Sequence, residues 1–369
     1  MGRALVNFFY CHPVGHAVEA LYYANGHHAA NPDMEFAVAL NAATAVELAD
    51  FCPFISAKYA VDHPLLESCA DSAQRVAHLP RQWDWVIDES RRYQDFQLQL
   101  FPGLKDYYDA TDKHLLPKHP RTVVTSPKVG YLRRQQLRLV LPDEARSTSG
   151  QRTITIMPGG SSEPELYPSV ESWLMIMDAL TEAYPDARLV LVGKLARTDR
   201  TSTTLTETDL ARLLAHRSGP VNCFDRGLTE QLATVEASDV FVSPHTGFGM
   251  AVLAVGTPWL ALSGGRWFEF FFNGVPFRSI IPDTDRFPSY TTFGSLPVID
   301  SDDGPRTPSM TKERFRADLD RIVAAAGELR DGTVSYEQCL SEYFPALLDA
   351  NGGDKSRLWS IDAVHLDYL

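Results

Sequence analysis

Two glycine-containing turns in the second half of the chain have the residue types that bind an anion. They are Pro158-Gly159-Gly160-Ser161-Ser162 and Ser243-Pro-His245-Thr246-Gly247-Phe248-Gly249, and each follows a short apolar run and precedes a helical pattern. Glycine lets backbone amides come close to a phosphate, and a helix N-terminus adds about half a positive charge. The turns therefore predict a phosphate-type site built from backbone amides, although such turns also occur where nothing binds.

Two histidines near the start of the chain could do acid–base chemistry. His12 and His16 flank Pro-Val-Gly, between a short apolar run and a helical pattern. An imidazole with a pKa of about 6.5 suits proton abstraction at neutral pH. We take His16 as the candidate base and His12 as the alternative, with Glu19, one turn after His16, able to orient the ring. The competing interpretation is a histidine that only caps the helix or packs in the core.

Two further segments contain charged residues that could contact a ligand. Arg266 and Glu269 lie in the aromatic run 264–273, whose rings could line a ligand site or pack in a core. Residues 113–142 contain no Asp or Glu but seven Lys and Arg residues. This basic stretch could approach a bound diphosphate, face the acidic second half or form a solvated surface.

Strands and helices alternate along both halves of the sequence. Short apolar runs predict strands at 4–10, 35–40, 83–87, 122–126, 153–157, 188–192, 239–242 and 259–262. Helical patterns lie at 17–24, 170–184, 312–329 and 335–348, and loops are expected at 196–209 and 297–311. This order predicts an α/β protein with doubly wound parallel sheets, in which ligands bind outside the carboxyl ends of the strands.

The length of 369 residues suits two domains. We expect an N-terminal Rossmann-like domain over 1–142, a polar linker over 143–152 and a second Rossmann-like domain over 153–340. A helical tail over 341–369 could pack back on the first domain. The second domain should bind the anion, because both glycine-containing turns lie in it.

The charge of the chain narrows the class of partner. The net charge is −13, with −2 in residues 1–150 and −11 in the remainder, which disfavours nucleic acid as a partner. No apolar run reaches the length needed to span a bilayer, and the five cysteines form no C-x-x-C pair. A cytoplasmic protein with reduced thiols is expected.

The segment Asp239–Pro258 resembles the diphosphate-binding segment of two-domain nucleotide-sugar glycosyltransferases of the GT-B type. The most similar pattern is that of the lipopolysaccharide heptosyltransferases, which use ADP-heptose. Ile156–Ser161 is similar to the strand-Pro-Gly loop of that family, Tyr167-Pro168 stands at its usual Trp-Pro, and Arg226–Ala233 is similar to its preceding turn and helix. Two positions depart from the pattern: His245 replaces the family's Asp, and Met250 replaces its helix His.

The resemblance implies a GT-B architecture of two Rossmann-like domains with the active site in the cleft between them. It implies no cofactor and no metal, with a nucleotide-diphosphate sugar as co-substrate. Gly15-His16 is similar to the Gly-His pair that supplies the base in several inverting GT-B enzymes, whereas heptosyltransferases place an Asp in this region. The donor-binding residues implied are Gly159, Gly160, Ser161, Phe224, His245, Thr246, Gly247, Phe248, Gly249 and Arg266.

The expected reaction is an inverting, metal-independent transfer of a sugar to a hydroxyl of a small-molecule acceptor. The acidic surface is compatible with a cationic acceptor, and antibiotic or other secondary-metabolite biosynthesis is the expected setting. Two alternatives stay open: a nucleotide-sugar epimerase or hydrolase of the same fold, and a non-catalytic sugar- or protein-binding module. A nicotinamide enzyme is disfavoured, because no G-x-G-x-x-G follows a strand near the start of either half.

Overall fold

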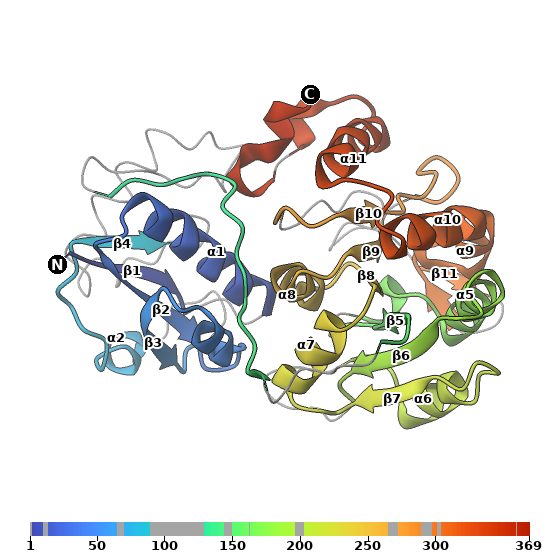
Figure 1. Cartoon of the computed structure of the whole chain (residues 1–369), viewed down its shortest axis with the longest axis horizontal. Helices are drawn as coiled ribbons and strands as arrows, with labels where there is room; N and C mark the ends of the chain where they lie inside the picture. Colours follow the sequence, from blue (N-terminus) through green and yellow to red (C-terminus); the bar gives the residue numbers. More distant parts are fainter. Residues whose placement is uncertain are drawn as a thin grey trace. The chain divides into compact units, whose positions relative to one another are not determined.

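A computed structural model of the chain describes residues 2–9, 14–64, 70–88, 129–143, 150–161, 163–195, 203–264, 272–288, 297–300, 304–358 and 360–369. These residues divide into two units (Figure 1). The described residues of Met1–Val140, Glu269–Gly274 and Trp359–Asp367 make up the first unit. Those of Leu141–Phe268, Val275–Leu358 and Tyr368–Leu369 make up the second. The chain therefore crosses between the units more than once.

The first unit is built on a parallel sheet with the strand order β3-β2-β1-β4. Its strands are β1 (Arg3–Phe8), β2 (Glu35–Asn41), β3 (Ile55–Val61) and β4 (Trp85–Asp88). The central strands β1 and β2 are almost entirely buried, because they are apolar on both faces. The helix α1 (Val14–Ala30) packs on these two strands and begins shortly after the carboxyl end of β1.

The second unit contains a larger parallel sheet with the order β10-β9-β8-β5-β6-β7. Its strands are β5 (Thr153–Ile156), β6 (Arg188–Gly193), β7 (Val221–Phe224), β8 (Val240–Pro244), β9 (Trp259–Leu262) and β10 (Phe277–Ser279). A separate antiparallel pair joins β11 (Val298–Asp300) to β12 (Gly304–Arg306). The strands β8 and β5 are neighbours in the middle of the sheet, so the turns that follow them meet at one edge.

Helices occupy much of the remaining described chain. In the first unit a short helix, α2 (Ser72–Arg75), accompanies α1. The second unit contains α5 (Val170–Ala183), α6 (Glu207–Leu214), α7 (Leu228–Glu236), α8 (Gly247–Val255), α9 (Lys312–Ala317), α10 (Leu319–Arg330) and α11 (Tyr336–Ala350). Short 3₁₀ segments are η1 (Val46–Phe51), η4 (Pro164–Leu166), η5 (Pro308–Met310), η6 (Lys355–Arg357) and η7 (Ile361–Asp367). In the described ranges no helix is both long enough and apolar enough to cross a bilayer.

The α/β class with two parallel sheets is confirmed, and seven of the eight expected strands are present. The eighth, 122–126, lies outside the described residues. The expected loop at 297–311 is wrong, because it contains the β11–β12 pair. The range expected for the loop, 196–209, extends too far, because α6 begins at Glu207. Thr206 and Asp209 form a capping box at the start of this helix.

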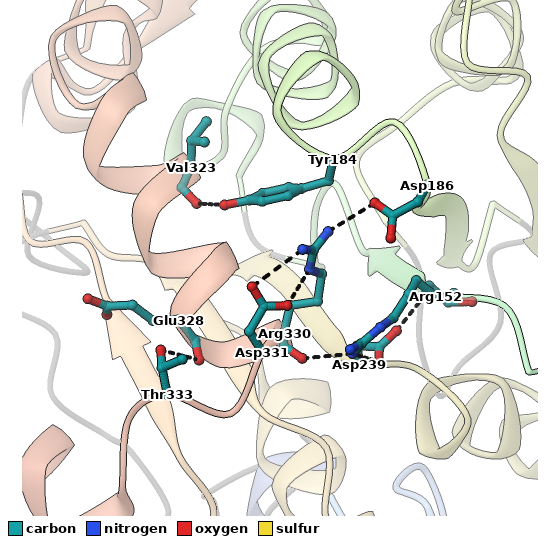
Figure 2. Close-up of polar contacts among 10 residues, drawn as sticks. Arg152, Tyr184, Asp186, Asp239, Val323, Glu328, Arg330, Asp331 and Thr333 are labelled. Carbon is teal, nitrogen blue, oxygen red and sulfur yellow. Dashed lines mark hydrogen bonds and ion pairs between the residues drawn. The ribbon is translucent and has the colours of Figure 1, made fainter.

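Figure 2 shows a polar network in the second unit that includes Arg152 and Asp239. These two residues directly precede β5 and β8, so the network lies at the edge of the sheet opposite the glycine-containing turns. The guanidinium of Arg330 lies 4.1 Å from the centre of the Tyr184 ring, and its Nη1 donates to Asp186 3.3 Å away. The carbonyl of Arg330 accepts from Arg152 Nη1 at 3.0 Å. Arg152 also donates to Asp239, which lies immediately before β8. Arg330 therefore connects the end of α10 to the starts of two central strands.

We expect Arg330→Ala to lower the free energy of unfolding by about 1–3 kcal/mol, because it removes the cation–π contact with Tyr184 and the side-chain hydrogen bonds to Asp186 and Asp331. Urea unfolding measures this loss. Arg330→Lys should lose less, since it keeps the charge but not the planar fork. The network lies away from the glycine-containing turns, so nucleotide affinity should stay unchanged in both variants. A stability equal to that of the wild type would contradict the role given to Arg330.

Candidate functional site

The two glycine-containing turns are in contact at the carboxyl edge of the second sheet. A Cβ placed on Gly160 would lie 3.4 Å from the methyl group of Thr246 and 2.6 Å from the hydroxyl of Tyr167. No side chain therefore fits at Gly160 unless its neighbours move. Gly159 and Gly160 are themselves buried, and the turn reaches the surface at Ser161, at the edge where open α/β sheets bind their ligands.

The second turn forms the N-terminus of α8. Thr246 is the N-cap residue, and its Oγ1 accepts from the amide of Gly249 at 3.2 Å. The amides of Gly247 and Phe248, the first two of the helix, have no carbonyl four residues back within the helix. These two donors and the helix dipole make the N-terminus of α8 suited to a phosphate group.

Two residues of this turn also have packing roles in the second unit. The amide of Gly249 is engaged by the Thr246 cap, and a Cβ on Gly249 would lie 2.3 Å from the Trp259 ring. Gly249 thus allows α8 to pack closely on β9. The side chain of Phe248 is buried, and its ring centre lies 5.8 Å from that of Phe241 in the core. Only the backbone of Phe248 could contribute to the site.

A short segment that the sequence analysis assigned to a loop borders the first turn. The amide of Thr204 donates to Gly160 O at 3.1 Å, and the amide of Thr203 donates to Lys194 O at 2.7 Å. A Cβ on Gly159 would lie 3.0 Å from Leu205. This segment therefore connects the carboxyl ends of β5 and β6. Its four consecutive hydroxyl residues, Thr201-Ser202-Thr203-Thr204, were the available signal in the sequence, because hydroxyl side chains commonly line polar sites.

The carboxyl ends of β6 and β7 carry a cation that the sequence analysis missed. Lys194 directly follows β6, and its ammonium lies 3.7 Å from a carboxylate oxygen of Asp225. Asp225 has a left-handed backbone (φ 59°) and accepts from the amide of Leu195 at 2.9 Å. Because Lys194 belongs to the same sheet edge as Gly160, it is a candidate contact for an anionic ligand.

The remaining expected donor residues differ in how accessible they are. Phe224 is buried, and a Cβ on Gly193 would lie 2.6 Å from its ring, so the ring packs on the backbone of β6. His245 is half-buried, with its ring centre 5.9 Å from that of Trp259. Ser161 is exposed at the end of the first turn. Arg266 lies outside the described residues.

In the first unit, His16 forms the pair expected from its spacing to Glu19. Its Nδ1 lies 3.1 Å from Oε2 of Glu19, and the hydroxyl of Tyr23 donates to Oε1 of the same carboxylate at 3.1 Å. The Glu19 side chain is 1% exposed, whereas that of His16 is 16% exposed. The alternative base, His12, lies outside the described residues.

The pairing with Glu19 selects the tautomer of His16. An ionised carboxylate only accepts hydrogen bonds, so the Nδ1 of His16 must be the donor. The Nε2 of a neutral His16 then carries a lone pair that can accept a proton. A histidine oriented in this way by a buried carboxylate is the arrangement that a general base requires.

Two other expectations concern charge. Among the described residues, no group of three or more His, Cys, Asp or Glu residues could hold a metal ion. The basic stretch 113–142 is described only from residue 129. In that part, Arg133 and Arg134 each lie 3.6 Å from Asp367 near the C-terminus.

No protein-family model matches the sequence, and no curated protein matches it either. Several solved structures, however, superpose on this chain. A glycosyl transferase family 9 protein from Veillonella parvula DSM 2008 superposes with a TM-score of 0.57 at 14% identity, over 90% of this chain and 97% of that one. The ADP-heptose lipopolysaccharide heptosyltransferase II of E. coli gives 0.53 at 12% identity, over 88% and 99%.

The E. coli heptosyltransferase WaaC with ADP gives a TM-score of 0.50 at 11% identity, over 87% of this chain and 99% of that one. These likenesses extend over both units. The chain therefore has the GT-B fold of these proteins, which confirms the predicted architecture of two Rossmann-like domains and the resemblance to heptosyltransferases at the level of fold.

Proposed function

We propose that the protein is a glycosyltransferase that moves a sugar from a nucleotide-diphosphate sugar to a hydroxyl of an acceptor. The observation that carries this proposal is the contact between the Gly160 turn and the N-terminus of α8 in a GT-B fold. Structures of similar fold include a heptosyltransferase with ADP and one named for ADP-heptose. The carboxyl edge of the second sheet, where open α/β sheets bind their ligands, is the proposed place for a diphosphate in this chain.

The donor is held by local dipoles in this proposal, because the second half of the chain has a net charge of −11. The amides of Gly247 and Phe248 and the turn at Gly159, Gly160 and Ser161 surround the diphosphate. Lys194 supplies a cation beside them. The nucleoside lies toward Phe224 and Asp225, at the ends of β6 and β7, and His245 and Arg266 complete the donor site.

His16 is the proposed base of the transfer, with His12 as the alternative. The acceptor oxygen forms a bond to C1 of the donor sugar while the bond from C1 to the diphosphate oxygen breaks. The acceptor proton passes to Nε2 of His16, and the leaving diphosphate takes the electron pair. The dipole of α8 stabilises the leaving charge. Attack from the face opposite the diphosphate inverts the configuration at C1.

The remaining features of the proposal concern setting and acceptor. We place the enzyme in the cytoplasm, acting without a metal on a small-molecule acceptor in secondary-metabolite biosynthesis. A cationic acceptor, such as an amino sugar, would complement the acidic surface. Incubation with donor alone separates transfer from epimerisation or hydrolysis, because only transfer requires an acceptor.

A thermal-shift panel of nucleoside diphosphates and their sugars, beginning with ADP and ADP-heptose, tests the donor site. A ligand at about 100 times its Kd should stabilise the folded protein by about 2.7 kcal/mol. Gly160→Ala should weaken binding about tenfold or more, because its methyl group would displace Tyr167 and narrow the turn. Gly150→Ala is the matched control, since a Cβ there meets nothing within 4 Å. No shift with any member of the panel would overturn the proposal.

A further inference from the structure

The C-terminal segment Ser360–Asp367 belongs to the first unit, although in sequence it follows Val275–Leu358, which belongs to the second. Its central residue, Asp362, is 2% exposed and lies against α1 and the stretch 131–134. Both Asp362 and Ala363 have left-handed backbones, with φ of 59° and 53°. Such conformations are costly for residues other than glycine and persist where surrounding contacts enforce them.

Asp362 accepts hydrogen bonds at both carboxylate oxygens and at its carbonyl. Oδ2 accepts from the Tyr22 hydroxyl and from the Arg134 amide, both at 2.8 Å, and Oδ1 accepts from the Tyr131 hydroxyl at 2.7 Å. The carbonyl accepts from Nε and Nη2 of Arg133, at 2.9 and 2.6 Å. Burial raises the pKa of Asp362, while these donors act in the opposite direction. A buried acid with so many directed partners fixes their positions.

One of these partners lies on the helix that carries His16. Tyr22 is three residues after Glu19 on α1, so the two side chains are neighbours on the helix surface. The next residue, Tyr23, donates to Glu19, and its ring centre lies 6.5 Å from that of Tyr131. Asp362 thus connects Tyr22 on α1 to Tyr131, and the Tyr131 ring in turn lies beside Tyr23, which holds Glu19.

We propose that Asp362 is a positioning residue for the base His16, acting through Tyr22 and Tyr131 on the α1 turn that holds Glu19. The inference rests on the role proposed for His16. It assigns a function in the first unit to the last residues of the chain: they fix the rotation of α1, and thereby the direction in which Nε2 of His16 points.

Histidine-selective NMR of the full-length protein tests this proposal without any substrate. The His16 ring signal is the one of eleven that disappears in His16→Gln. In Asp362→Asn this signal should move or broaden, while circular dichroism stays that of a folded protein. Asp367→Asn is the matched control, because Asp367 lies in the same segment but is more exposed, and its ion pairs among the described residues are the two 3.6 Å contacts with Arg133 and Arg134. It should leave the signal in place.

An unchanged His16 signal in Asp362→Asn would overturn the proposal. If that variant does not fold, Tyr22→Phe decides, since it removes one hydrogen bond without burying an unpaired charge. With a donor identified by the thermal-shift panel, Asp362→Asn should lower turnover about tenfold and leave the donor KM within about twofold. If no nucleotide sugar is used, the proposed function fails, whereas the NMR result still decides whether Asp362 positions His16.

Discussion

Replacing His16 with Gln should lower the turnover of sugar transfer by about 10²- to 10⁴-fold, the usual contribution of a positioned general base. Glutamine keeps polarity and much of the length of histidine but cannot take up the acceptor proton. The Kd for the donor's nucleoside diphosphate, measured by calorimetry, should stay within about twofold, because the donor groups belong to the second unit. The expected result is therefore a loss of kcat without a loss of donor binding.

Two companion variants separate the base from its support. Glu19→Gln leaves His16 in place but removes the carboxylate that fixes its tautomer, so turnover should again fall. Tyr23→Phe removes only the second hydrogen bond to Glu19 and should cost less. If His16→Gln turned over at a rate close to that of the wild type, His16 would be excluded as the base, and His12 would become the candidate to test.

The strands that could be predicted from the sequence are mostly central in the sheets, whereas those that could not be predicted lie at the edges. The strands β1, β2, β5, β6, β8 and β9 have neighbours on both sides, are buried on both faces and appear in the sequence as continuous apolar runs. The strands missed in the two parallel sheets, β3, β7 and β10, all lie at edges of those sheets. In Ile55–Val61, half-buried and exposed residues alternate, so no apolar run marks β3. β4 is also at an edge but was predicted, because Trp85, Val86 and Ile87 are all buried.

The candidate site could be predicted where its parts are local in sequence. His16 and Glu19 are three residues apart on a helix, and that spacing alone predicts their contact. The meeting of the Gly160 and Thr246 turns followed from the rule that parallel strands end at one edge. Asp362 lies 340 residues after Tyr22, so their hydrogen bond depends on the tertiary path of the chain and has no local signal.

Gly249 shows why a motif does not define the role of each of its residues. Its position in the turn suggested a ligand contact, but the ring of Trp259 occupies the space where its side chain would be. The indole of Trp259 also donates to Ser243 at 3.0 Å. A glycine required for helix packing and a glycine required for ligand approach look the same in a single sequence.

Another histidine on α1, His27, should make the free energy of unfolding depend on pH below neutrality. It is fully buried between Phe36 and Tyr131, and its Nδ1 lies 2.8 Å from the carbonyl of Gly130. The carbonyl can only accept, so Nδ1 donates, and in the neutral ring Nε2 carries no proton. Nε2 is buried without a hydrogen-bond partner among the described residues. Protonation there would bury a charge among apolar rings, and burial lowers the pKa of His27 from 6.5 to about 4.

The sign of the pH effect follows from which state binds the proton. Below pH 6.5 the unfolded chain takes up a proton at His27 and the folded protein does not, so acid favours unfolding. His27 should therefore lower the free energy of unfolding by about 3 kcal/mol as the pH falls from above 6.5 to 4, with no further loss below that. Urea unfolding at several pH values between 7.5 and 4 measures this slope.

His27→Asn isolates the contribution of His27, because the asparagine amide can still donate toward Gly130 but does not titrate. The variant should be less stable than the wild type at pH 7.5, since the ring contacts with Phe36 and Tyr131 are lost. The difference between the two proteins should then shrink as the pH falls toward 4. The exposed His78 provides the control: the free energy of unfolding of His78→Asn should change with pH as that of the wild type does. If His27→Asn also runs parallel to the wild type over this range, acid unfolding has its cause in other groups and the buried ring at His27 does not determine it.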